Sequence, residues 1–314
     1  MSALVLPAVI ALGAAAGYAA GAVLQQRGAF GPGAAGSSGA AMPVTAMFRR
    51  PIWLAGLGLD GVGFTLEFFA LRASSVTLVQ PLLVCGLIFA LPLGALLART
   101  RISKTDLGAG ALVVLGLVLF LIAARPVEGS AVVPVGRWVG VVGVSGGIVG
   151  VLLLLSRGRR AALRAVLLGA AAGVVNGVFA GLAKAVSSVL ERGWAALLGS
   201  WQPVALAVAA VLTLTLAAKT FQVGSPAAAV TGLFAVEPLA GIAVGTSVFG
   251  DTIAVTPLQL SAEVVGMILA LGGVTLLARS PAVLAVYAAP PEGARLPAAA
   301  HTESSELTRT ERSP

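Results

Sequence analysis

The chain has 314 residues, of which 58% are hydrophobic and only 10% are charged, and its mean hydropathy is +1.01. A soluble domain does not bury this much apolar side chain, so the composition predicts a membrane protein. The formal net charge is +8. The cationic residues lie in short segments between apolar runs, which indicates control of membrane topology and argues against nucleic-acid binding.

Nine apolar runs are long enough for a helix to cross the hydrocarbon core, which takes about 20 residues. They are apolar all round, whereas the strands of a membrane β-barrel alternate between apolar and polar side chains. We therefore expect an all-α polytopic membrane protein. Its transmembrane helices are predicted at about 3–24, 52–71, 76–97, 106–124, 138–155, 163–188, 202–219, 226–248 and 259–279.

The first run is predicted to be a membrane helix and not a cleaved signal peptide, because no basic residue precedes it. The segment 29–48 contains GPGAAGSSGAA and is expected to be a flexible linker, and the polar tail 281–314 is expected to be disordered. Loops one, three and five carry ten Lys and Arg residues, against four on the opposite side. This predicts a plasma-membrane protein with its N-terminus outside and its C-terminus in the cytoplasm.

An internal duplication is indicated by the sequence LGAAAG, which occurs at 12–17 and again at 168–173. Three further pairs of glycines keep the same offset: Gly21 and Gly177, Gly110 and Gly266, Gly116 and Gly272. We predict a first repeat at 1–124, a linker with helix five at 125–162, and a second repeat at 163–280. The period of five helices inverts the second repeat in the membrane, an arrangement on which alternating access is built. The glycine faces themselves indicate close helix packing.

Ionisable side chains inside membrane spans are costly, so they are the first candidates for a functional site. Asp60 and Glu67 are seven residues apart, which places them on one face of a helix, roughly 10 Å apart along its axis. Glu237 precedes Pro238 in a later span. Gln80 and Asn176 add polar groups, and Lys184 is a possible charge partner of Glu67.

The single cysteine, Cys85, rules out an intramolecular disulfide, and the single histidine, His301, lies in the polar tail. The sequence therefore gives little support to a histidine metal site or a nucleophilic triad. We expect no enzyme activity, no cofactor and no confident metal site.

Two stretches, SSVTLVQPLL at 74–83 and AVEPL at 235–239, resemble the drug/metabolite transporter superfamily, whose members are built from inverted repeats of mostly five helices. The nine-helix layout lacks the tenth helix of that superfamily. Together with VLQQRG at 23–28 and WLAG at 53–56, it resembles the NIPA-type magnesium transporters. That resemblance implies a glutamate where this chain has Phe64. The chain also looks like the Ala-, Val- and Leu-rich integral membrane proteins of actinobacteria.

The resemblance implies a transporter that moves a small metabolite or cation between two inverted repeats. Its substrate is expected to bind near Asp60, Glu67, Gln80, Asn176 and Glu237. A divalent-cation transporter or channel, with Asp60 and Glu237 as ligands, is one alternative, and a non-transporting membrane scaffold that binds through its tail is another. The expected partners are the lipid bilayer and a small-molecule or cation substrate, without nucleic acid. The oligomeric state is left open.

Overall fold

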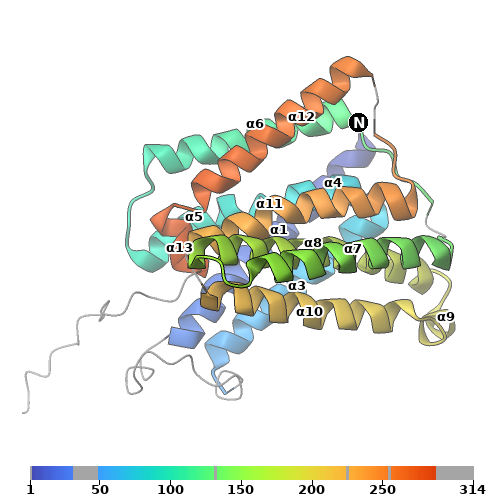
Figure 1. Ribbon diagram of the computed structural model, residues 1–314, viewed down its shortest axis with the longest axis horizontal. Coiled ribbons are helices and arrows are strands. Elements are labelled where there is room, and N and C mark those ends of the chain that lie inside the picture. The colour runs from blue at the N-terminus through green and yellow to red at the C-terminus, as the bar shows by residue number, and fades with distance from the viewer. Residues whose placement is uncertain (1, 31–48, 131–132, 224–225, 254–255, 288–314) are drawn as a thin grey trace, which may run out of the picture.

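The computed structural model describes residues 2–30, 49–130, 133–223, 226–253 and 256–287 (Figure 1). These ranges are helical apart from their loops and one isolated antiparallel bridge between Val127 and Thr252. The helices are α1 (Ser2–Phe30), α3 (Pro51–Ala73), α4 (Val76–Leu83), α5 (Gly86–Ala98), α6 (Lys104–Ala124), α7 (Val135–Ser156), α8 (Ala161–Leu190), α9 (Trp194–Leu198), α10 (Gln202–Val223), α11 (Pro226–Val244), η1 (Gly245–Phe249), α12 (Pro257–Leu277) and α13 (Pro281–Tyr287).

Eight helical segments in the described part of the chain are long and apolar enough to cross a membrane. They are Leu4–Gln25, Pro51–Ala73, Val76–Leu97, Lys104–Ala124, Val135–Ser156, Ala161–Leu190, Pro226–Phe249 and Pro257–Leu277. The remaining predicted span, the seventh along the chain at 202–219, corresponds to α10, whose apolar part, Gln202–Ala217, is shorter. The all-α class is thereby confirmed for these ranges, and the set of helices is that of a multi-pass membrane protein.

Two of the spans are irregular, one in its middle and one at its end. The third consists of α4 and α5, separated at Val84 and Cys85, whose amides donate to the carbonyl oxygens of Pro81 and Leu82 in tight turns. Pro81 lies inside α4 just before this break, and without an amide hydrogen it cannot donate to the carbonyl oxygen of Thr77 one turn earlier. The span of α11 continues into the π-helical turn η1 and ends at Gly250, whose φ of 72° favours glycine.

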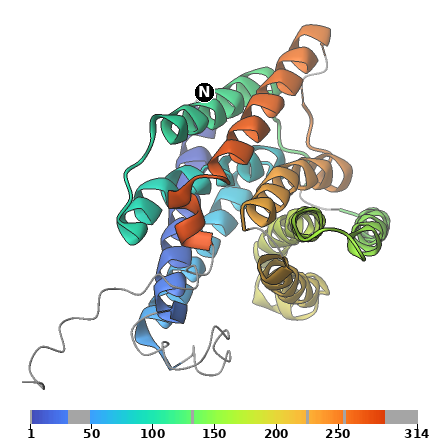
Figure 2. The same cartoon turned by 60° about the vertical axis from the view of Figure 1, so that its left-hand side comes forward.

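The helices pack in an arrangement that brings distant parts of the sequence together. Helix α1 packs against α3, and α8 packs against α7, α10 and α11. Helices α6 and α12 cross each other on one side of the bundle, and α10 lies on the opposite side (Figures 1 and 2). Helix α4 contacts α11, so the two predicted halves meet at this pair.

The glycines of both LGAAAG copies lie at close helix contacts, as their spacing predicts. A Cβ atom at Gly17 would lie 3.2 Å from the Cα of Gly63 in α3. A Cβ atom at Gly173 would lie 2.8 Å from the carbonyl oxygen of Leu233 in α11. The copies therefore have the same packing role. However, the two copies pack against helices that are not equivalent in the predicted repeats. The first copy packs against α3, the second predicted span, and the second copy packs against α11, the eighth predicted span, whereas the period of five helices makes the seventh span the equivalent of the second.

The predicted disorder of 281–314 is wrong at its beginning. Residues 281–287 form α13, which packs against α5 and buries Ala282, Val283 and Val286. A Cβ atom at Gly94 would lie 1.8 Å from the carbonyl oxygen of Ala282, so the absence of a side chain at Gly94 admits this helix. The rest of the predicted tail, and the linker 29–48 beyond Phe30, lie outside the described residues.

Candidate functional site

Glu67 lies at the centre of a buried group of polar side chains. It is 4% exposed, and its carboxylate accepts hydrogen bonds from the hydroxyl of Tyr18 at 2.6 Å and from Nε2 of Gln80 at 3.0 Å. Tyr18 comes from α1 and its ring lies against Gly63, whose lack of a side chain leaves room for it. Gln80 is fully buried in α4, and its Oε1 has no hydrogen-bond partner among the described residues. Three helices thus meet around one carboxylate.

Glu237 brings α11 to the same region. It is 7% exposed and accepts a hydrogen bond of 2.6 Å from Nδ2 of Asn176 in α8. One turn further along α11, Gly241 lies against the side chain of Gln80. Glu67 and Glu237 are close enough for their charges to interact. Each predicted repeat therefore contributes one buried carboxylate to this place.

Asp60 lies about two turns before Glu67 in α3 and is half-buried. It accepts a short hydrogen bond from Nε2 of Gln25 in α1, and its carboxylate lies over Gly21. Both acids of α3 therefore face α1, and Tyr18 is within electrostatic reach of Asp60, Glu67 and Glu237. We call this group the polar cluster. Its members are Tyr18, Gln25, Asp60, Glu67, Gln80, Asn176 and Glu237.

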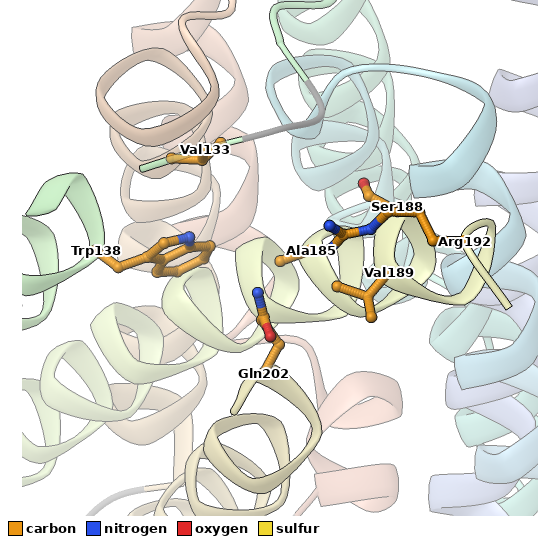
Figure 3. Close-up of a pocket in the computed structure, with 7 residues that line it drawn as sticks. All are labelled: Val133, Trp138, Ala185, Ser188, Val189, Arg192 and Gln202. Atoms are coloured by element: carbon orange, nitrogen blue, oxygen red, sulfur yellow. The ribbon is translucent and has the colours of Figure 1, made fainter. Parts of the chain in front are cut away.

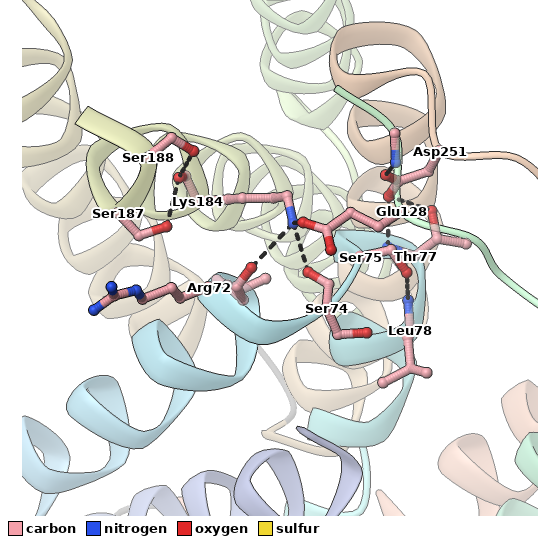
Figure 4. Close-up of polar contacts among 12 residues, drawn as sticks. Arg72, Ser74, Ser75, Thr77, Leu78, Glu128, Lys184, Ser187, Ser188 and Asp251 are labelled. Carbon is pink, nitrogen blue, oxygen red and sulfur yellow. Dashed lines mark hydrogen bonds and ion pairs between the residues drawn. The ribbon is translucent and has the colours of Figure 1, made fainter. Parts of the chain in front are cut away.

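Lys184 is not the charge partner of Glu67, and this part of the sequence prediction is wrong. The Lys184 ammonium is buried and donates to Oε1 of Glu128 at 2.6 Å and to the carbonyl oxygens of Leu71 and Ser74 at 3.0 and 2.5 Å (Figure 4). It also lies 5.7 Å from the centre of the Phe249 ring. Within the described residues, the carboxylates of the polar cluster are consequently held by neutral donors alone.

A second carboxylate joins the segments around Lys184. Asp251, just after η1, is buried and accepts hydrogen bonds from the amide and hydroxyl of Thr77 at 3.3 and 3.0 Å and from the amide of Gly129 at 3.0 Å (Figure 4). The bridge between Val127 and Thr252 lies beside it. We call this region, with Lys184, Glu128 and Asp251, the Lys184 end of the bundle. Its polar contacts connect α4, α8, η1 and the loop after α6.

A cavity of about 160 Å³ opens beside the Lys184 end (Figure 3). It lies between the C-terminal part of α8 and the first turns of α7 and α10. Its lining residues are Val133, Trp138, Ala185, Ser188, Val189, Arg192 and Gln202. None of them belongs to the polar cluster.

The structure brings together four of the predicted site residues in two hydrogen-bonded pairs, Glu67 with Gln80 and Asn176 with Glu237. It adds Tyr18 and Gln25, which sequence reasoning missed. The signal was available: Tyr18 and Gln25 are seven residues apart, like Asp60 and Glu67, and consecutive spans run antiparallel. Phe64, at the position where a glutamate was expected, packs against Phe179 with ring centres 5.5 Å apart. Over the described residues, no three His, Cys, Asp or Glu side chains gather in a way that could hold a metal ion.

Comparisons with known proteins place the chain beside one relative without supplying a function. The chain is 26% identical over 210 residues to an uncharacterized protein of Corynebacterium glutamicum, a match that covers 67% of this chain and 73% of the relative. No protein-family model matches the sequence. No solved structure matches it either.

Proposed function

We propose that the protein is a membrane transporter of the drug/metabolite type, which moves a small metabolite or cation by alternating access between two inverted repeats. The observation that carries the proposal is that two buried carboxylates, Glu67 and Glu237, lie in the same part of the bundle and accept hydrogen bonds from neutral donors only, among the described residues. Two carboxylates in a low-dielectric interior are costly unless protons or a cation compensate their charge. Bound protons or a cationic cargo would supply this compensation.

The position of the cluster supports the same conclusion. Tyr18, Glu67 and Gln80 come from the first predicted repeat, and Asn176 and Glu237 come from the second. A site between two repeats is the usual place for the substrate of a transporter with internal duplication. The contact between Gly241 and Gln80 joins the two sides, so a shift of α11 against α4 would change the hydrogen bonds of Glu67.

The Lys184 end supplies a second support. The charge distribution of the loops predicts that this end faces the outside. There the bonds of Lys184 and Asp251 connect residues of both predicted repeats with the loop between them. Such bonds would have to break if the protein opened at this end, as alternating access requires.

Transport in proteoliposomes tests the proposal. The purified protein is reconstituted with a pH-sensitive dye inside, and organic amines, amino acids, Mg²⁺ and other metabolites are added outside in turn. We expect at least one compound to change the internal pH or to accumulate in a protein-dependent way. Glu67→Gln and Glu237→Gln should abolish that signal. Asp106→Asn, which changes a carboxylate that caps α6, should retain it.

The outcome separates the alternatives. A signal that survives both Glu67→Gln and Glu237→Gln would show that the site is wrong. A signal seen only with Mg²⁺ and lost in Asp60→Asn would favour the divalent-cation transporter. Complete inactivity toward every compound would leave the proposal without support and favour the scaffold.

A further inference from the structure

The cavity beside the Lys184 end is lined by a cation and by a buried amide oxygen, neither of which has a partner among the described residues. The guanidinium of the exposed Arg192 has no hydrogen bond or ion pair with any of these residues, and Oε1 of Gln202 is buried and accepts no hydrogen bond from them. Figure 3 shows both side chains directed toward the space between α8 and α10. Buried polar atoms are nearly always hydrogen-bonded, so the Gln202 oxygen indicates a group that occupies this space.

The rest of the lining restricts what that group can be. The neighbouring acids are already engaged, Glu191 with Arg72 at 2.8 Å and Glu128 with Lys184 at 2.6 Å. Helix α10 begins at Gln202, so the positive end of its dipole adds to the charge of Arg192. Val133, Val189 and the indole of Trp138 form apolar walls. Trp138 is held by edge contacts with Trp201 and Phe249, at centroid distances of 5.8 and 5.9 Å.

We propose that this cavity binds a small carboxylate that also carries an N–H or O–H donor. The guanidinium of Arg192 matches a carboxylate in charge and in its planar fork of donors. The second donor satisfies Gln202, and the short carbon body lies against Trp138. A cavity of about 160 Å³ holds roughly five waters' worth of volume, which suits a compound of about five to eight non-hydrogen atoms. The ligand can be an amino acid or a hydroxy acid, since both carry this chemistry.

Binding to the full-length protein in detergent tests the proposal without any transport step, so its failure is distinct from failure of the proposed function. The probes are L-alanine and L-lactate, with propionate lacking the second donor and L-lactamide lacking the carboxylate. Isothermal titration and tryptophan fluorescence follow the binding. We expect saturable binding of alanine or lactate, and the one that binds more tightly identifies the second donor. Lactamide should bind at least about tenfold more weakly because its neutral amide cannot form the charge-assisted pair with Arg192.

Variants assign the effect to the cavity. Arg192→Gln should weaken binding of the preferred probe by about tenfold or more, since it removes the charge-assisted pair. Arg125→Gln removes an equal charge from an exposed position outside the cavity lining and should leave the affinity unchanged. Gln202→Leu should abolish the preference over propionate. Arg192 is exposed, so its variant is expected to fold, and an unchanged unfolding temperature checks this.

Three results would overturn the proposal. The first is the absence of saturable binding for both alanine and lactate. The second is equal affinity of the wild-type protein and Arg192→Gln. The third is equal binding of lactate and lactamide, which would show that the carboxylate is not recognised.

Discussion

The ammonium of Lys184 lies 2.6 Å from Oε1 of Glu128, although the sequence suggested Glu67 as its partner. The lysine side chain is 2% exposed and the glutamate side chain 41%, so this ion pair connects the interior to the surface. The remaining ammonium hydrogens serve the carbonyl oxygens at the end of α3, so every donor of Lys184 is used. The pair therefore holds the loop after α6 against α3 and α8.

Removal of this ammonium should destabilise the protein. Lys184→Met leaves two carbonyl oxygens and Glu128 without a donor, and we expect a loss of about 2–3 kcal/mol, because Glu128 can turn toward water. Glu128→Gln keeps an acceptor and should cost only about 1 kcal/mol. Chemical denaturation followed by tryptophan fluorescence measures both. Equal stability of Lys184→Met and the wild type would mean that the pair does not hold this end together.

The packing of α8 on α11 should not tolerate a methyl group. A Cβ atom at Gly177 would lie 2.6 Å from the Cβ of Ala240 and 2.7 Å from the amide nitrogen of Gly241, so the helices would have to separate. Gly177→Ala should therefore cost about 1–3 kcal/mol. A Cβ atom at Gly147 in α7 would meet no described neighbour within 4 Å, and Gly147→Ala is the matched control with an effect of at most about 1 kcal/mol in the stabilising direction. A similar unfolding temperature for the two variants would contradict the close contact.

The hydroxyl of Tyr18 is expected to contribute to stability and transport separately from the packing of the ring. Tyr18→Phe keeps the packing against Gly63 and removes one of the two donors to Glu67. We expect a loss of about 1–3 kcal/mol in stability and a reduced transport rate. The proteoliposome assay and thermal unfolding measure the two effects. Wild-type behaviour in both would show that Glu67 does not depend on this bond.

Gly241 provides a way to disturb the polar cluster without changing a polar group. A Cβ atom at this position would lie 2.5 Å from Cγ of Gln80 and would push that side chain away from Glu67. Gly241→Ala should thus lower transport. Because the atoms it meets are Cβ and Cγ of the fully buried Gln80, close to the backbone of α4, the two helices would also have to shift, and we expect a loss of stability similar to that of Gly177→Ala. The transport rate and the unfolding temperature are measured for both variants and compared. If Gly241→Ala transports normally, the position of Gln80 does not matter for function.

Two ionic groups near the Lys184 end should differ in their importance. Asp251→Asn replaces one of two buried accepting oxygens by a donor that faces donors, and we expect a cost of about 1–3 kcal/mol. Arg72→Gln breaks a surface pair whose side chains are 46% and 48% exposed, which should cost about 0–1 kcal/mol. Denaturation of both variants side by side measures the difference. The reverse order would contradict the hydrogen bonds of Asp251.

The helices were largely predictable because hydrophobic length is a strong signal. The run predicted at 163–188 corresponds to Ala161–Leu190, and the run at 259–279 to Pro257–Leu277. The break inside the third span falls between its two prolines, Pro81 and Pro92, and hydrophobic length alone does not reveal it. The short helix α13 was missed because its seven residues are too few to show a period.

The partners of the charged residues were harder to predict. Depth along a span follows from counting residues, and Lys184 was therefore named as a possible charge partner of Glu67. Direction around the helix axis depends on which neighbours pack there, and α8 turns Lys184 toward the end of α3 and the loop that carries Glu128. Asn176 and Glu237, by contrast, were both among the residues expected near the substrate, and α8 and α11 do bring them together.

The break between α4 and α5 has a consequence for experiments on this protein. Cys85 is the only thiol of the chain, and at 8% exposed it lies at this break among residues of α5, α6, α11 and α12. A maleimide can reach it only when these helices separate or the chain unfolds. The unmodified protein is therefore already a single-cysteine reporter, and the rate of its alkylation, with and without a compound, reads the opening of the bundle directly.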